Sequence, residues 1–318
     1  MSVRYRGKQI YLEDGRLNLM DQNIKSISKI EGLAELDGLR ELMLSNNNIT
    51  KIDGLTNLGN LRELDLSFNR IEKLRGLEDL CNLEVLDLAK NRIKTIQGID
   101  SSIKLRELRL GGNQITQLNN LDKQERLQSL DLISNKLTKI GGLDSLTELR
   151  VLDLSCNMIV KIEGLDKSKR LQTLTLKSNR VGRIEGLAAL SSLKELDLSQ
   201  NQISKIEGLE KLLALHSLDL SENQIPQIEG LEKLRELRAL RLQHNSINKI
   251  EGLETLTQLT ELLLEENRIA KIEGLGTLVH LQELQLFGNR IRDWPRDAEG
   301  NEKMDATSIV EFSQKRSR

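Results

Sequence analysis

Acidic side chains recur in this sequence at fixed positions of a 22-residue period. A regular array of carboxylates is therefore the main group of residues that could bind a ligand or partner. The reference point of the period is an asparagine, and Glu often stands six residues before it and Asp four residues before it. Residues with the same offset line up in space when repeats stack on one another. The Glu members are Glu41, Glu63, Glu107, Glu195, Glu261 and Glu283, and the Asp members are Asp65, Asp87, Asp131, Asp153, Asp197 and Asp219.

These columns concentrate negative charge on one face. With Glu265, two residues before its Asn, the face has 13 acids against the three bases Arg109, Lys177 and Arg241, a formal charge of −10, whereas the whole chain carries −1. Neighbouring Asp carboxylates repel by roughly 1 kcal/mol per pair even in water. Stability alone is therefore not expected to favour the face, and Arg109 is expected to bridge Asp87 and Asp131.

Two interpretations of the acidic face stay open. As a docking surface, it would attract a partner with a basic face and orient it. Alternatively, one ancestral LDLS strand was duplicated and its solvated Asp is harmless. Nucleic-acid binding is a weaker reading, because Glu from Glu163 to Glu273 neutralises most of a basic column and no aromatic residues interleave with it. That column comprises Lys51, Lys73, Lys139, Lys161, Arg183, Lys205, Lys249 and Lys271.

Catalytic and metal chemistry find little support. Glu222, His244 and Glu266 directly precede the Asn in three successive repeats and should lie side by side, but such flexible rim carboxylates usually form ion pairs. The sequence contains no phosphate-binding loop and no nucleophile motif. We expect a protein that is not an enzyme, with no metal site and no cofactor.

The spacing of apolar residues defines the elements that position these columns. Leu152 and Leu154 have a spacing of two, as in a short strand whose intervening residues face the other side. After the Asn, apolar residues recur every three positions, which suits a 3₁₀-like turn. The Gly seven residues after the Asn, replaced only by Asn120 and Arg296, predicts positive φ or close backbone approach. Stacking then gives a concave parallel sheet backed by a convex layer of turns.

The repeated asparagine is expected to be structural. An amide can donate to and accept from backbone groups that the inward turn removes from water, and losing one should cost about 1–3 kcal/mol. Twelve such residues keep the 22-residue period without a break. They are Asn47, Asn69, Asn91, Asn113, Asn135, Asn157, Asn179, Asn201, Asn223, Asn245, Asn267 and Asn289.

Both ends of the array depart from the period. Residues 1–16 are expected to form an N-terminal cap, as a hairpin turning at Gly7-Lys8. Residues 17–294 form one solenoid domain of one degenerate repeat, with Lys25 in the Asn position, and twelve regular repeats. Residues 295–318 form a C-terminal cap, in which Met304, Ile309 and Phe312 fold over the last layer as a short helix, or a disordered tail.

The pattern LxxLxLxxNxI resembles the leucine-rich repeat family in its 22-residue subclass. The resemblance implies an α/β fold, a right-handed β/3₁₀ superhelix that serves protein binding. Since the first 15 residues lack an apolar leader and no long apolar run follows, we expect a protein of the cytoplasm, with the nucleus as a second location, that is monomeric on its own.

The motif NxIxKIEGLxxL resembles the repeats of the leucine-rich regulatory subunits of protein phosphatase 1. Those subunits hold the catalytic subunit on their concave face through acidic and aromatic residues. The middle column here has no aromatic residue, so its hot spots would be missing. Adaptors such as a dynein light chain or a spliceosomal subunit are the alternative, and the missing leader argues against secreted internalins. The resemblance implies that the Asp residues of the middle column, Glu195, Glu261 and Glu283 contact the partner. The full set of predicted partner-binding residues on the concave face is Asp65, Asp87, Glu107, Arg109, Asp131, Asp153, Glu195, Asp197, Asp219, Arg241, Glu261, Glu283 and Phe287.

Overall fold

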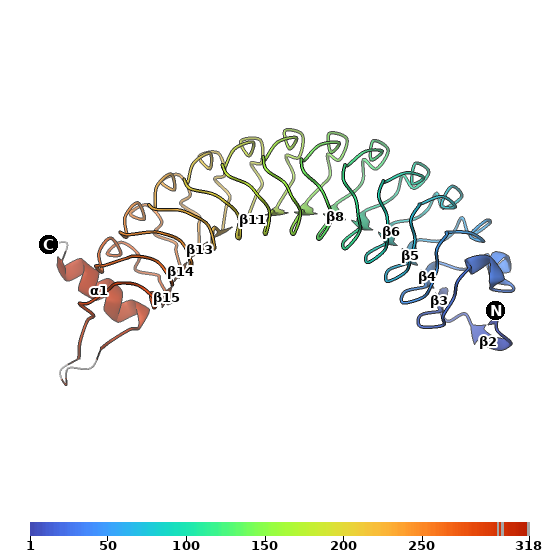
Figure 1. The fold of residues 1–318 in the computed structure, drawn as a ribbon, viewed down its shortest axis with the longest axis horizontal. Helices are drawn as coiled ribbons and strands as arrows, with labels where there is room; N and C mark the ends of the chain where they lie inside the picture. The colour runs from blue at the N-terminus through green and yellow to red at the C-terminus, as the bar shows by residue number, and fades with distance from the viewer. Residues whose placement is uncertain (298, 300–301, 317–318) are drawn as a thin grey trace. The chain divides into compact units, whose positions relative to one another are not determined.

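The computed structural model describes residues 1–297, 299 and 302–316, and the chain divides into two compact units, 1–158 and 159–318. Within each unit, three-residue parallel strands lie on one side and tight turns on the other (Figure 1). The predicted fold class, a parallel-sheet solenoid with few helices, is confirmed.

Seven strands form the parallel sheet of the first unit. Each strand pairs with the next strand along the chain, and from β4 onward the register shift equals the 22-residue period, as in the pairing of Leu64 with Leu86. The central Leu is buried and its two neighbours face the other side, as the alternation of a strand requires. The strands are β3 (Arg16–Asn18), β4 (Glu41–Met43), β5 (Glu63–Asp65), β6 (Val85–Asp87), β7 (Glu107–Arg109), β8 (Ser129–Asp131) and β9 (Val151–Asp153).

The second unit repeats this arrangement with six strands. Leu196 of one strand pairs with Leu218 of the next, again 22 residues further along. Both leucines are at most 2% exposed, so the core is a stack of aliphatic layers. The strands are β10 (Thr173–Thr175), β11 (Glu195–Asp197), β12 (Ser217–Asp219), β13 (Ala239–Arg241), β14 (Glu261–Leu263) and β15 (Glu283–Gln285).

The turns opposite the strands explain the three-residue apolar spacing. The N–H of Leu190 donates to the carbonyl of Leu187, and the N–H of Leu193 donates to the carbonyl of Leu190, at 3.0 and 3.1 Å. Such hydrogen bonds between residues three apart are those of 3₁₀ geometry. Among the described residues, two segments extend into 3₁₀ helices, η1 (Ile27–Lys29) and η2 (Leu33–Glu35).

The repeated glycine meets both conditions that its position suggested. Gly186 has φ +69°, and a Cβ atom there would lie 2.2 Å from the carbonyl oxygen of Ile162. Asn120, which stands at the same position, adopts φ +61° and donates its side-chain N–H to Ile96 O at 2.7 Å. The backbone conformation is thus kept at Asn120, whereas Arg296, the other replacement, does not adopt positive φ.

The repeated asparagine connects neighbouring layers. The Asn157 Nδ2 atom donates to the carbonyls of Leu132, Leu154 and Ser155 at 3.0–3.1 Å. Its Oδ1 atom accepts the N–H of Leu137 at 3.0 Å. Because Leu132 and Leu137 belong to the preceding layer, each such Asn satisfies backbone groups of two layers at once.

The N-terminal end is a two-stranded antiparallel hairpin, β1 (Ser2–Tyr5) and β2 (Lys8–Tyr11). Its turn was predicted one residue too late: Arg6 and Gly7 are the turn residues, since both have positive φ and Tyr5 pairs with Lys8. A two-residue hairpin turn of this type needs positive φ at both positions.

The degenerate first layer corrects a second expectation. Gln22, and not Lys25, stands in the Asn position, because Leu17 pairs with Leu42, five residues before Asn47. The side-chain amide of Gln22 donates to Met20 O at 2.9 Å, much as each Asn bonds the carbonyl two residues earlier. This layer is three residues longer than the others, and counting back in steps of 22 therefore misplaced the position.

The C-terminal end carries α1 (Ala306–Arg316), which begins after Asp305, whose carboxylate accepts the N–H of Ser308. Ile309 is 1% exposed, and the Ser313 hydroxyl accepts the N–H of Leu275 at 3.2 Å, so the helix lies against the last turns. Met304 does not fold inward as expected, being 55% exposed.

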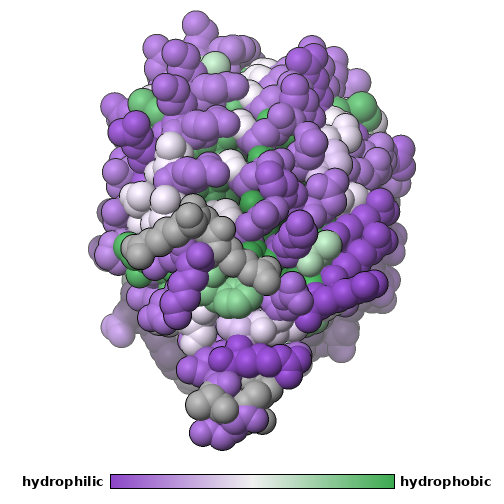
Figure 2. Space-filling view, turned by 90° about the vertical axis from the view of Figure 1, so that its left-hand side faces the viewer, coloured by the Kyte–Doolittle hydropathy of each residue, from purple (hydrophilic) through white to green (hydrophobic). Residues whose placement is uncertain are grey.

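Residues 298, 300–301 and 317–318 of the anticipated cap or tail lie outside the described residues. Figure 2 shows this end, where hydrophilic side chains dominate the surface.

Candidate functional site: the acidic strand faces

The strand face of the first unit consists of the outward side chains of β4 to β9 and of the residues that end these strands. It gathers seven carboxylates and one guanidinium, a formal charge of −6. Arg16 at the edge of the sheet pairs with Glu41 at 3.6 Å. The acids of this face are Glu41, Glu63, Asp65, Asp87, Glu107, Asp131 and Asp153, and the base is Arg109.

The strand face of the second unit, on β10 to β15, is acidic as well. Six carboxylates stand against two bases there, a formal charge of −4. Arg241 pairs with Glu261 at 2.7 Å, which leaves most of the other carboxylates without a basic neighbour on the face. The acids are Glu195, Asp197, Asp219, Glu261, Glu265 and Glu283, and the bases are Lys177 and Arg241.

The Asp column has a structural role that the sequence analysis missed. Oδ1 of Asp65 accepts the N–H and the hydroxyl of Ser67 at 2.9 and 2.6 Å, and Asp131 accepts the N–H of Ile133 at 2.8 Å. Each Asp thus fixes the turn that ends its own strand, an Asx turn. These hydrogen bonds give each Asp a structural role that a neutral Asn could also fill, so they account for the acceptor at this position but not for its charge.

Partial burial makes the charge on this column costly. Burial raises the pKa of Asp87, Asp131 and Asp219, with backbone or side-chain hydrogen bonds acting in the opposite direction. Burial also raises the pKa of Glu63, and neighbouring Glu41 adds to the effect. A basic partner would lower the cost of keeping these groups charged.

Arg109 forms one of its two expected ion pairs, with Asp87, and pairs with Glu107 instead of Asp131. Its guanidinium contacts Glu107 at 2.7 Å and Asp87 at 3.2 Å. Glu107 lies on the same strand two residues away and therefore on the same face, so it competes with Asp131 for the guanidinium. Asp131 keeps its carboxylate on the turn of its own strand and has Asp153 as an acidic neighbour.

The last layers of the second unit combine apolar and acidic groups. Phe287 is 61% exposed, and one carboxylate oxygen of Glu265, in the preceding layer, is buried without a hydrogen-bond donor among the described residues. Burial raises the pKa of Glu265. The sequence predicted Phe287 as a contact residue from its place in the column. The missing hydrogen-bond donor to Glu265 could be found only from the packing.

A further exposed aromatic was missed because it stands outside the three columns. Phe68 directly precedes Asn69, is 56% exposed and has φ +51°. The residue before the Asn has positive φ in every regular repeat, and a bulky side chain is disfavoured in that conformation. Phe68 adjoins the acidic face of the first unit through the turn of Asp65, so this unit does offer an aromatic contact.

The other candidate chemistries reduce to local pairing. Lys161 pairs with Glu163 at 3.7 Å and Lys249 with Glu251 at 3.0 Å, which is the neutralisation expected for the basic column. Glu222, His244 and Glu266 all have positive φ. Within residues 1–297, 299 and 302–316, no group of three potential metal ligands comes together, and no helix is both long and apolar enough to span a membrane.

The fold and its charged strand faces define a class of protein: a solenoid with an exposed, acidic parallel-sheet face. The chain belongs to the leucine-rich repeat family. Family models described as "Leucine Rich repeats (2 copies)" match residues 37–79, 81–123, 125–167 and 169–211, and one described as "Leucine-rich repeat" matches residues 193–296. Proteins of this family generally act as protein–protein interaction scaffolds, and no catalytic family is indicated.

Solved structures of other proteins have the same fold. An internalin, InlF from Listeria monocytogenes, is 28% identical over 82% of this chain and 77% of its own, with a TM-score of 0.76. Internalin C2 from the same organism is 29% identical over 67% of this chain and 85% of its own, with a TM-score of 0.55. The leucine-rich repeat domain of APL1B, at 20% identity, covers 89% of this chain and 90% of its own with a TM-score of 0.72, and shows the fold alone. A comparison with curated proteins matched none of them.

Proposed function

We propose that this protein is a non-catalytic scaffold that binds a basic protein surface on its acidic strand faces. The observation that carries the proposal is the first unit's strand face, where seven carboxylates stand against one guanidinium that is already paired twice. A face of this charge attracts a basic partner over distance and selects its orientation.

The burial of these carboxylates supports the proposal. Asp87 and Asp131 have raised pKa values because they are partly removed from water, and this effect of burial outweighs the opposite effect of Arg109 on both. The Asx turns account for one oxygen of each Asp, but a neutral Asn could make the same turn. Repeat duplication alone would also make Asp and Glu recur, and the variants below test whether the charge of these residues serves binding.

For the partner's identity, we propose a catalytic subunit of the protein phosphatase 1 type. The support is the resemblance of the NxIxKIEGLxxL wording to regulatory subunits of that enzyme. The exposed Phe68 and Phe287 supply part of the aromatic contact that the middle column lacks. This proposal places the protein in the cytoplasm and nucleus, where such subunits act.

The test uses two double variants of equal charge change. Asp131→Asn with Asp153→Asn removes two charges from the strand face and keeps both turn acceptors, while Glu72→Gln with Glu125→Gln removes two exposed charges elsewhere in the same unit. We expect the first to weaken partner capture from lysate by about tenfold and to reduce its salt dependence, and the second to leave capture unchanged.

Purified phosphatase catalytic subunit then separates the two levels of the proposal. Measurable binding by titration calorimetry, weakened by the strand-face variant, supports the specific partner. If that enzyme does not bind but capture of other proteins still depends on Asp131 and Asp153, the scaffold proposal stands and the phosphatase proposal is wrong. Equal capture by both variants would overturn the acidic strand face as the docking surface.

A further inference from the structure

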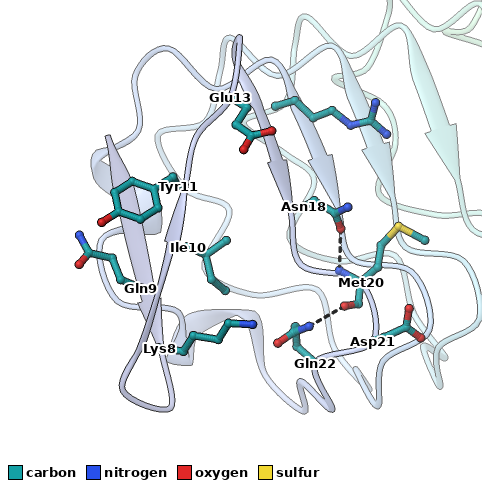
Figure 3. Close-up of a pocket in the computed structure, with 10 residues that line it drawn as sticks. Lys8, Gln9, Ile10, Tyr11, Glu13, Asn18, Met20, Asp21 and Gln22 are labelled. Carbon is teal, nitrogen blue, oxygen red and sulfur yellow. Dashed lines mark hydrogen bonds between the residues drawn. The ribbon is translucent and has the colours of Figure 1, made fainter.

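The N-terminal hairpin and the first strand of the parallel sheet enclose a groove in the first unit. A cavity of about 840 Å³ lies between β2 and β3, within the roughly 300–1,000 Å³ range of ligand sites. Figure 3 shows Lys8 and Ile10 extending from β2 toward the segment that carries Asn18 and Met20. This groove is separate from the acidic columns discussed above.

One wall of the groove presents unpaired backbone groups of β2. In the hairpin, Tyr5 pairs with Lys8 and Leu12 donates its N–H to Met1 O, so the hydrogen-bonded positions of β2 are the even-numbered ones. Arg4, opposite Gln9, instead exchanges both of its backbone hydrogen bonds with Glu31. The N–H and C=O groups of Gln9 and Tyr11 therefore point away from β1, and none of the described residues hydrogen-bonds to them.

The opposite wall presents the edge of β3. Leu17 pairs into the sheet with β4, and Leu19 donates its N–H to Met43 O. In a parallel ladder, the residue between them, Asn18, directs its N–H and C=O to the other side. That side faces the groove, and no hydrogen bond to either group exists in the described part of the chain.

The two walls fail to pair with each other. Glu13 and Arg16 exchange backbone hydrogen bonds at 2.9 and 2.7 Å, which joins the strands at one end of the groove. Continuing that register would place Tyr11 opposite Asn18, where no bond forms. The groove is thus an antiparallel ladder that begins and then separates, leaving hydrogen-bonding edges on both sides.

We propose that this groove binds an extended peptide segment of a partner protein by strand addition. Gln9, Tyr11 and Asn18 supply the backbone hydrogen bonds, as in other modes of β-augmentation. The lining contains two cations, Lys8 and Arg16, and two carboxylates, Glu13 and Asp21. The balance favours a segment of about four residues without net charge, in which one apolar side chain contacts Ile10.

The probe is a displayed library of random linear heptapeptides, selected on the full-length protein. Gln9→Pro removes the outward N–H of Gln9, and the hairpin tolerates the change because that N–H makes no internal bond. Gln9→Ala is the matched control, since it removes the same side chain, including its contact with Ser2, and keeps the N–H. Both variants should unfold at the same temperature as the wild type.

We expect enriched peptides of low net charge that bind the wild type and Gln9→Ala equally and bind Gln9→Pro at least about tenfold more weakly. Hydrogen exchange should slow at Gln9, Tyr11 and Asn18 when the peptide is bound. A library that yields no binder, or binders indifferent to Gln9→Pro, would overturn the proposal. A wild type that dimerises and becomes monomeric in Gln9→Pro would also overturn it, by assigning the groove to a second copy of the chain.

Discussion

Asp219 Oδ1 accepts both the backbone N–H and the hydroxyl of Ser221, at 2.9 and 2.6 Å. The same carboxylate that gives the strand face its charge therefore closes the turn after its strand. Charge and turn geometry can be separated experimentally, because an Asn side chain provides the acceptor without the charge.

Asp219→Asn should stabilise the second unit in a pH-dependent manner. Burial raises the pKa of Asp219 in the folded state above 3.8. Its contribution to stability is therefore complete below the unfolded-state value and is lost as the pH rises through the folded-state pKa. The variant should match the wild type in acid and exceed it increasingly toward neutral pH, as urea unfolding at a series of pH values can show. The control Glu210→Gln removes an exposed charge, and a difference that grows toward acid instead would contradict the argument.

Asn91→Ala should destabilise the first unit by about 3 kcal/mol or more. Its Nδ2 atom donates to the carbonyls of Leu66, Leu88 and Ala89, and its Oδ1 atom accepts the N–H of Ile71 at 2.9 Å. These groups lie in two layers and cannot reach water once the amide is gone. Urea unfolding measures the loss, and exposed Asn119→Ala should change stability by less than about 0.5 kcal/mol. Similar losses for both variants would mean that the side-chain bonds contribute little.

Gly186→Ala should destabilise the second unit by more than about 2 kcal/mol, since it adds both a positive-φ penalty and a clash. The added Cβ would lie 2.2 Å from Ile162 O, a backbone atom that cannot move without shifting its layer. Gly182→Ala is the control, because nothing lies within 4 Å of its Cβ position. Thermal unfolding of the two variants should differ by several degrees, and equal midpoints would refute the close-approach explanation.

Phe68→Asn should weaken binding of the proposed partner without lowering stability. Asn tolerates positive φ and already occupies the equivalent position as Asn46, with φ +55°. Loss of an aromatic anchor at an interface commonly weakens affinity by tenfold or more. Ile103→Asn removes another exposed apolar side chain, located outside the strand face, and should bind normally. Unchanged affinity of Phe68→Asn would remove this side chain from the interface.

Ile309→Asp should loosen the C-terminal layers and spare the first unit. Ile309 is 1% exposed on α1, whereas Thr307 on the same helix is exposed and serves as the control in Thr307→Asp. Solenoid repeats depend mainly on their neighbours, so unfolding should begin at the disturbed end. Hydrogen exchange should accelerate at Leu281, Leu284 and Leu286, and an unchanged pattern would show that α1 does not stabilise these layers.

The sequence by itself determined the parts of this protein that follow from period alone. A repeat of fixed length must place residues of equal offset in register, so the strands, the layered core, the glycine conformation and the acidic columns could be predicted from Asn and Leu spacing. The hydrogen bonds of Asn157 to two layers follow from the same regularity, because every layer presents the same unpaired backbone groups.

Only the tertiary structure decided what depends on competition between side chains or on breaks in the period. Arg109 pairs with Glu107 rather than Asp131, and the Asp carboxylates turn back onto their own strand ends, because local geometry offers nearer partners than the column does. The 22-residue period stops at both ends of the array, so it cannot predict the structure there. This applies to the position of Gln22, to α1 and to the open groove beside β3. Spacing fixes which residues become neighbours, whereas packing fixes which of those neighbours bond.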